Sequence, residues 1–130
     1  MTYRTNQYQE SSDPFDKLPT AVDIAEAKEK KLAEWRRIGR EIAMDPYVIR
    51  QLVADASHFL EKTGRCSLDL AMCYKNRLPG SEPENSVMLA AIAEELVARF
   101  QAKGYSTFYA LDRNSEDSDT LHVFVPGYNE

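Results

Sequence analysis

The clearest helical pattern of the chain runs over residues 46–63. Asp45 can cap the first turn, Pro46 fits the first helical position, and Gly64 is a natural stop. The apolar-face positions recur at intervals of three and four: Ile49, Leu52, Val53, Ala56, Phe59, Leu60 and Thr63. This pattern predicts an amphipathic helix with one face on a core.

A second amphipathic helix is predicted over residues 84–103. Ser81 and Glu84 fit a capping box before it, and Gly104 follows it. Its apolar face consists of Met88, Leu89, Ile92, Leu96, Val97 and Phe100. We expect the helices of residues 46–63 and 84–103 to supply most of the core.

Residues 20–44 also predict one helix, with Thr20 as its cap, but the apolar pattern is uneven. The apolar positions are Ile24, Leu32, Trp35, Ile38 and Ile42. Residues 26–31 are polar on every side and have nothing to bury. Such a stretch either stands in water or lies along a partner.

Three segments have strand character. Residues 66–74 alternate between apolar and other side chains, which favours a half-buried strand, with a short helix as the alternative. In that helix Leu68, Ala71 and Met72 would point inward. Residues 105–111 and 120–125 are rich in aromatic and β-branched residues and predict two further strands, joined by a polar loop over 112–119.

The predicted fold class is therefore α+β, in the order α-α-β-α-β-β. We expect a small two-layer domain with two to three helices packed on one face of a three-stranded sheet. If the strands on either side of the third helix are parallel neighbours, their connection should be right-handed. Residues 46–126 would form the compact body, 20–44 a long and partly exposed helix, 1–19 an extended arm and 127–130 a tail.

Composition narrows the class of protein. The 130 residues are 43% hydrophobic and 28% charged, which is typical of one small globular domain. No apolar stretch approaches the roughly 18 residues of a membrane span, and the N-terminus lacks a signal-peptide pattern. We expect a cytoplasmic or virion protein without contact to a membrane.

The net charge of −5 is unevenly distributed. Residues 28–50 carry +3 and residues 66–130 carry −5. The acidic body argues against nucleic acid as a partner, because phosphate contacts need clustered Lys and Arg. The basic segment around Trp35, Arg36, Arg37 and Arg40 can be read as a protein-binding face, a phosphate contact, or a solvated helix neutralised by neighbouring glutamates.

Motifs for catalysis or ligand binding are absent from the sequence. There is no nucleophile elbow, phosphate loop or dinucleotide fingerprint. Cys66 and Cys73 match no zinc spacing, and in one strand they would lie on opposite faces about 23 Å apart. The acidic residues 112–119 depart from a calcium loop at Asp117, where glycine is needed, and fit a solvated loop better. We therefore expect no catalytic residue, metal or cofactor, with both thiols reduced.

Two local patterns carry a resemblance to a known group of proteins. A helix–Gly–strand step runs from Phe59 to Leu70, and a helix leads into Gly104-Tyr105 and a hairpin. Together, over roughly residues 46–125, they resemble small structural and accessory proteins of tailed bacteriophages. The resemblance implies a role in assembly and no catalytic residues. The arm and the first helix lie outside this pattern. We expect these two segments to carry the role that is specific to this protein.

The leading functional hypothesis is a non-enzymatic protein-interaction or assembly module, such as a phage virion component. Its partner-binding residues would be the isolated aromatics of the arm and the basic part of the first helix: Tyr3, Tyr8, Phe15, Trp35, Arg36, Arg37 and Arg40. The partners would be other copies of the chain or other assembly proteins. The alternative is a small acidic inhibitor or regulator that binds a host protein through the C-terminal half.

Overall fold

The computed structural model describes residues 13–109 and 119–127 and has an α+β fold. The elements in chain order are η1 (Pro14–Lys17), α1 (Ala21–Ala43), α2 (Pro46–Thr63), β2 (Arg65–Asp69), α3 (Leu70–Cys73), α4 (Glu82–Ala102), β3 (Ser106–Tyr109) and β4 (Thr120–Phe124). The chain divides into two compact units, residues 1–32 and 33–130. The predicted fold class is confirmed.

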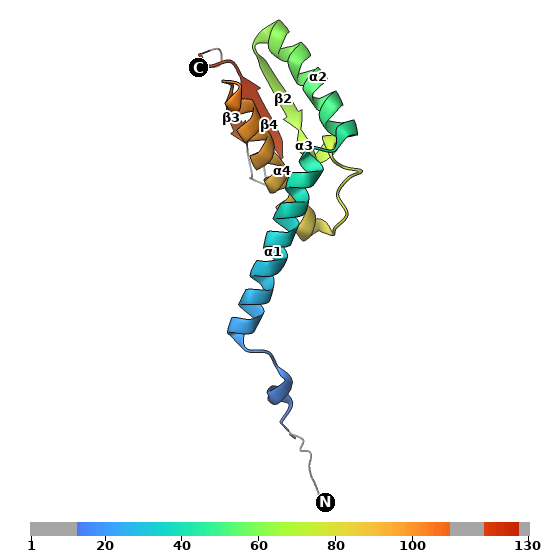
Figure 1. Cartoon of the computed structure of the whole chain (residues 1–130), viewed down its shortest axis with the longest axis vertical. Coiled ribbons are helices and arrows are strands. Elements are labelled where there is room, and N and C mark those ends of the chain that lie inside the picture. Colours follow the sequence, from blue (N-terminus) through green and yellow to red (C-terminus); the bar gives the residue numbers. More distant parts are fainter. Residues whose placement is uncertain (1–12, 110–118, 128–130) are drawn as a thin grey trace, which may run out of the picture. The chain divides into compact units, whose positions relative to one another are not determined.

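The three strands form one antiparallel sheet in the order β2-β4-β3 (Figure 1). β4 is the central strand and pairs with β2 on one side and with β3 on the other. β2 and β3 consequently run parallel to each other without being neighbours. The right-handed connection considered for neighbouring parallel strands therefore does not apply.

The core lies between one face of the sheet and helices α2 and α4. Alternate strand residues are buried on that face, as in Cys66 and Leu68 of β2 and Leu121 and Val123 of β4. They pack in one cluster with side chains of the two helices, among them Leu52, Ala56, Leu60, Leu89, Ile92 and Leu96. As the apolar patterns predicted, α2 and α4 supply most of the helical side of the core.

Capping residues set the helix boundaries where the sequence placed them. Asp45 Oδ1 accepts hydrogen bonds from the backbone N–H groups of Tyr47 and Val48, and Gly64 ends α2 in the left-handed region at φ 79°. The Ser81–Glu84 capping box is present at the start of α4. Local chemistry therefore determines both ends of α2 and the first turn of α4.

The strand prediction for residues 66–74 is right for its first half and wrong for its second. β2 ends at Asp69, whose Oδ1 accepts a hydrogen bond from the N–H of Met72 and caps the short helix α3. The inward side chains of α3 are Leu70 and, directly after it, Tyr74, whereas Met72 is exposed. The cap at Asp69 therefore turns the chain before the alternating pattern ends.

Part of the predicted extended arm is also helical. Pro14–Lys17 form a 3-10 turn, in which Asp13 Oδ1 accepts a hydrogen bond from the N–H of Phe15. Pro14 suits the first position of such a turn because its fixed φ is helical. α1 then begins after Thr20, whose hydroxyl accepts a hydrogen bond from the N–H of Asp23 as the predicted cap.

Candidate interaction surfaces

The first surface is the segment of residues 13–31, in which every residue is exposed. It includes four large apolar side chains: Phe15, Leu18, Val22 and Ile24. The exposed fraction of Phe15 is 75% and that of Val22 is 65%. Exposed apolar side chains that gather in one segment mark an interaction site more often than isolated ones do.

The C-terminal half of α1 is in a different situation, because it packs closely on α4 at Gly39. A Cβ atom built at Gly39 would lie 2.6 Å from the carbonyl oxygen of Met88 and 2.9 Å from the Cβ of Ala91. Both distances are shorter than real Cβ contacts, so only glycine allows this approach of the two helices. The local sequence pattern does not single out Gly39, because a glycine there looks like a weak position in a helix.

Two polar contacts hold the same end of α1. The buried hydroxyl of Tyr74 donates a hydrogen bond of 2.8 Å to the carbonyl oxygen of Ala43. That carbonyl belongs to the last turn of α1, where no helical N–H group remains to bond it. On the surface, Arg40 forms an ion pair of 3.7 Å with Glu94 of α4. Residues 39–43 are thus part of the folded body.

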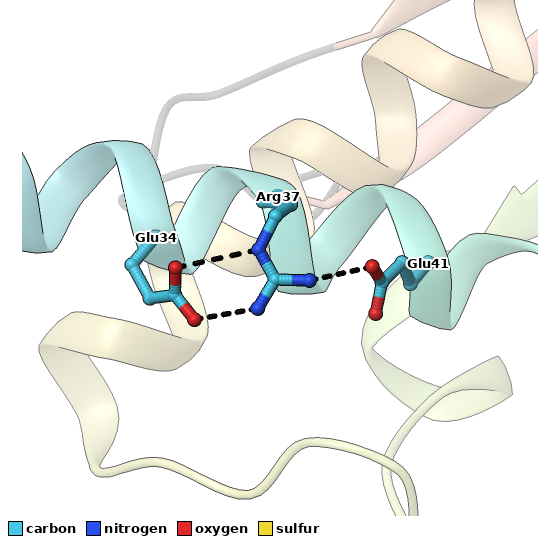
Figure 2. Close-up of polar contacts among 3 residues, drawn as sticks. All are labelled: Glu34, Arg37 and Glu41. Atoms are coloured by element: carbon cyan, nitrogen blue, oxygen red, sulfur yellow. Dashed lines mark hydrogen bonds and ion pairs between the residues drawn. The ribbon is translucent and has the colours of Figure 1, made fainter.

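The predicted basic face is largely neutralised within the chain. Figure 2 shows Arg37 between Glu34 and Glu41, and it forms ion pairs with both carboxylates. The hydrogen bond and charge of Glu34 raise the pKa of the Arg37 guanidinium, which therefore stays charged. Arg36 is exposed and forms no ion pair with any residue that the structure describes. These contacts agree with the reading of a solvated helix that pairs its charges locally.

Five of the seven predicted partner-binding residues lie in the part of the chain that the structure describes. Tyr3 and Tyr8 lie outside the described residues, and Phe15 is exposed. Trp35 is half-buried. It lies about 100° around the helix from Arg36, so the indole and the arginines occupy different faces of α1.

A second surface, not foreseen from the sequence, is a groove between α2 and α4. Its volume is about 420 Å³, within the range of roughly 300–1,000 Å³ that is typical of binding sites. Its lining is mostly apolar and includes the small side chains of Ala56 and Ser57, which leave room between the helices. Val53 lines it and is about half exposed, although the helical spacing predicted a place in the core.

The open face of the sheet forms a third surface. Ser67, His122 and Phe108 lie side by side across the three strands. The Ser67 hydroxyl and His122 Nδ1 are 2.9 Å apart, and the ring of Phe108 stacks on that of His122 with centroids 5.9 Å apart. His122 therefore lies on the outer face, and its contacts are those of a cross-strand row.

The two cysteines are buried or partly buried and unpaired. Burial raises the pKa of the Cys66 thiol to about 11, and the carboxylate of Asp55 and the thiol of Cys73 add to this shift. Burial also raises the pKa of Cys73. The turn at Asp69 thus brings Cys73 into electrostatic range of Cys66, unlike the distant pair expected for one strand. Protonated thiols are weak nucleophiles and weak metal ligands.

The acidic residues 112–119 were predicted to form a solvated loop. Asp119, the last of them before β4, departs from this prediction. Asp119 is buried, and its carboxylate accepts a hydrogen bond from the hydroxyl of Tyr109 across the hairpin. Its backbone adopts φ 66°, a region that Asp tolerates better than most residues. Residues 112–118 lie outside the described part of the chain, which contains no group of His, Cys, Asp or Glu residues able to hold a metal ion.

Comparisons with known proteins leave the family open. No family model, no curated protein and no solved structure matches the chain. Among the described helices, none combines the length and the apolar composition that a membrane crossing requires. The contacts described above are therefore the basis for a functional proposal.

Proposed function

We propose that the protein is a non-enzymatic assembly module that binds other copies of itself through residues 13–31. The observation that carries the proposal is the complete exposure of this segment, including Phe15, Leu18, Val22 and Ile24. Ordered apolar side chains in water are unfavourable by roughly 25 cal/mol for each Å² that a partner could cover. Binding of a partner would remove this surface from water.

The helical character of residues 21–31 supports the same proposal. Isolated helices of this length are marginal in water, and most helices are stabilised by packing. The N-terminal half of α1 has alanines and lysines, which favour a helix, but no buried residue. A segment that forms this helix part of the time loses less conformational entropy on binding than a fully unfolded one.

The resemblance of the helix–Gly–strand and Gly-Tyr–hairpin patterns to small proteins of tailed bacteriophages supports a more particular form of the proposal. In this form the assembly is a phage virion or an accessory complex. The segment of residues 13–31 lies outside these patterns, so it would supply the attachment specific to this protein.

Hydrogen exchange at several protein concentrations tests the proposal. We expect the amides of residues 21–31 to exchange rapidly in dilute solution and at least tenfold more slowly when copies associate. The amides of α2 should be protected in both conditions, because α2 belongs to the core. Equal exchange of residues 21–31 at all concentrations would contradict the proposal.

A further inference from the structure

The groove between α2 and α4 has the chemistry of a binding site for an acidic, apolar segment. Leu52 and Leu60 of α2 and Leu96 and Phe100 of α4 line it, together with Tyr105. Its two charged lining residues, Arg99 and Lys103, are both cationic.

The two cations are not equivalent. Arg99 forms an ion pair of 2.8 Å with Glu95, whereas Lys103 has no ion pair with any described residue. Lys103 is also exposed at the end of α4. The groove therefore offers an apolar lining next to an available positive charge.

Residues 13–26 have the complementary chemistry. They contain four carboxylates and one lysine, which gives a net charge of −3. Phe15 in η1, Leu18 directly after it and Val22 in α1 are all exposed. A segment with these side chains can place apolar groups in a groove while its carboxylates meet cations at the rim.

We propose that residues 13–26 of one copy bind in the α2–α4 groove of a second copy, with Lys103 attracting the acidic segment. This inference rests on the proposed function and adds the receptor surface. Each copy carries one segment and one groove, so the contact is head-to-tail. Such contacts build closed rings, of which a reciprocal dimer is the smallest, or open filaments.

Two variants with exposed substitutions separate the two sides of the contact. The segment variant is Phe15→Ser with Leu18→Ser, and the groove variant is Val53→Glu with Lys103→Glu. A control variant, Phe108→Ser with Lys62→Glu, makes a comparable change on the open sheet face and outside the groove lining. Circular dichroism melts confirm that each variant is folded.

Sedimentation velocity over a concentration series gives the masses of the assemblies that each protein forms. We expect the unmodified chain and the control to form dimers or larger assemblies, and each of the two variants alone to associate at least tenfold more weakly. Mixed in equal amounts, the two variants should form a one-to-one heterodimer and nothing larger, because one intact segment and one intact groove remain.

The outcomes separate this inference from the proposed function. If the groove variant associates like the unmodified chain while the segment variant does not, the groove is not the receptor and the proposed function stands. If neither variant changes the association, or the unmodified chain remains monomeric, both are wrong. A further test reverses the charges on the two sides of the contact. Lys103→Glu alone should weaken the association, and adding Asp23→Lys should restore part of it. No restoration would contradict attraction between Lys103 and the acidic segment.

Discussion

The two halves of α1 belong to one helix but are stabilised in different ways. Residues 21–31 are all exposed, and their helix depends on local propensity. Gly39 and Ala43 in the second half are buried, and Gly39 meets the backbone of α4. Continuity of a helix therefore says little about its burial. Gly39 has no side chain and allows close packing on α4, so the second half of α1 belongs to the body.

The largest expected effect comes from Gly39→Val. The added side chain would collide with the carbonyl of Met88 and the side chain of Ala91, so α1 must move away from α4. We expect a loss of about 3 kcal/mol in the free energy of unfolding, the upper part of the range for overpacking. Ala27→Val in the exposed half should cost only about 0.5 kcal/mol, the difference in helix propensity. Urea melts of both variants measure the contrast, and equal losses would show that the halves do not differ.

Tyr74→Phe tests the contact that holds the last turn of α1. It removes the hydroxyl that bonds the carbonyl of Ala43 and leaves a buried acceptor without this donor. The expected cost is about 1–2 kcal/mol. Tyr47→Phe is the matched control, because Tyr47 is exposed, and it should leave the melting temperature unchanged. A similar shift in both variants would contradict a specific role for Tyr74.

High pH should destabilise the body through Cys66. Its pKa is about 11 in the folded chain, whereas a thiol in an unfolded chain has a pKa of about 8.5. The folded state keeps its proton where the unfolded state loses it, so the free energy of unfolding falls as pH rises through this interval. We expect a loss of about 1 kcal/mol by pH 9.5. Cys66→Ala should remove this part of the pH dependence in melts at pH 7 to 10, and an unchanged slope would refute the assignment.

The smallest expected effect is that of deleting residues 1–19. Their described part, residues 13–19, is fully exposed and contributes no buried side chain. The thermal melting temperature measured in dilute solution should therefore stay the same. Self-association should be lost, because the deletion removes Phe15 and Leu18. A protein that unfolds without these residues would show that they stabilise the body.

Local signals in the sequence predicted a large part of this fold. Asp45, Gly64 and the Ser81–Glu84 pair define helix ends through bonds within a few residues, so they can be recognised without tertiary information. The division of residues 66–74 into a strand and a short helix depends on one more local signal, at Asp69. Asp69 is also a capping residue, and its competition with the alternating pattern ends the strand.

The candidate surfaces were harder to predict because they depend on distant partners. Val53 and Phe59 fit the apolar face of α2 by spacing, but each is about half exposed, since the apolar arc is wider than the buried stripe. Asp119 belongs to a polar stretch, yet Tyr109 gives it a buried hydrogen-bond partner across the hairpin. The close approach at Gly39 and the groove beside Lys103 both follow from the packing of helices far apart in the chain.

The order of strands in the sheet has a consequence for how the protein is made. β4, the central strand, is the last of the three in the chain, so β2 and β3 each wait for Thr120–Phe124 before they can form their ladder. A chain that lacks residues 120–124 would leave both β2 and β3 without a partner strand. Unpaired strand edges are templates for aggregation, so this one segment protects the whole sheet.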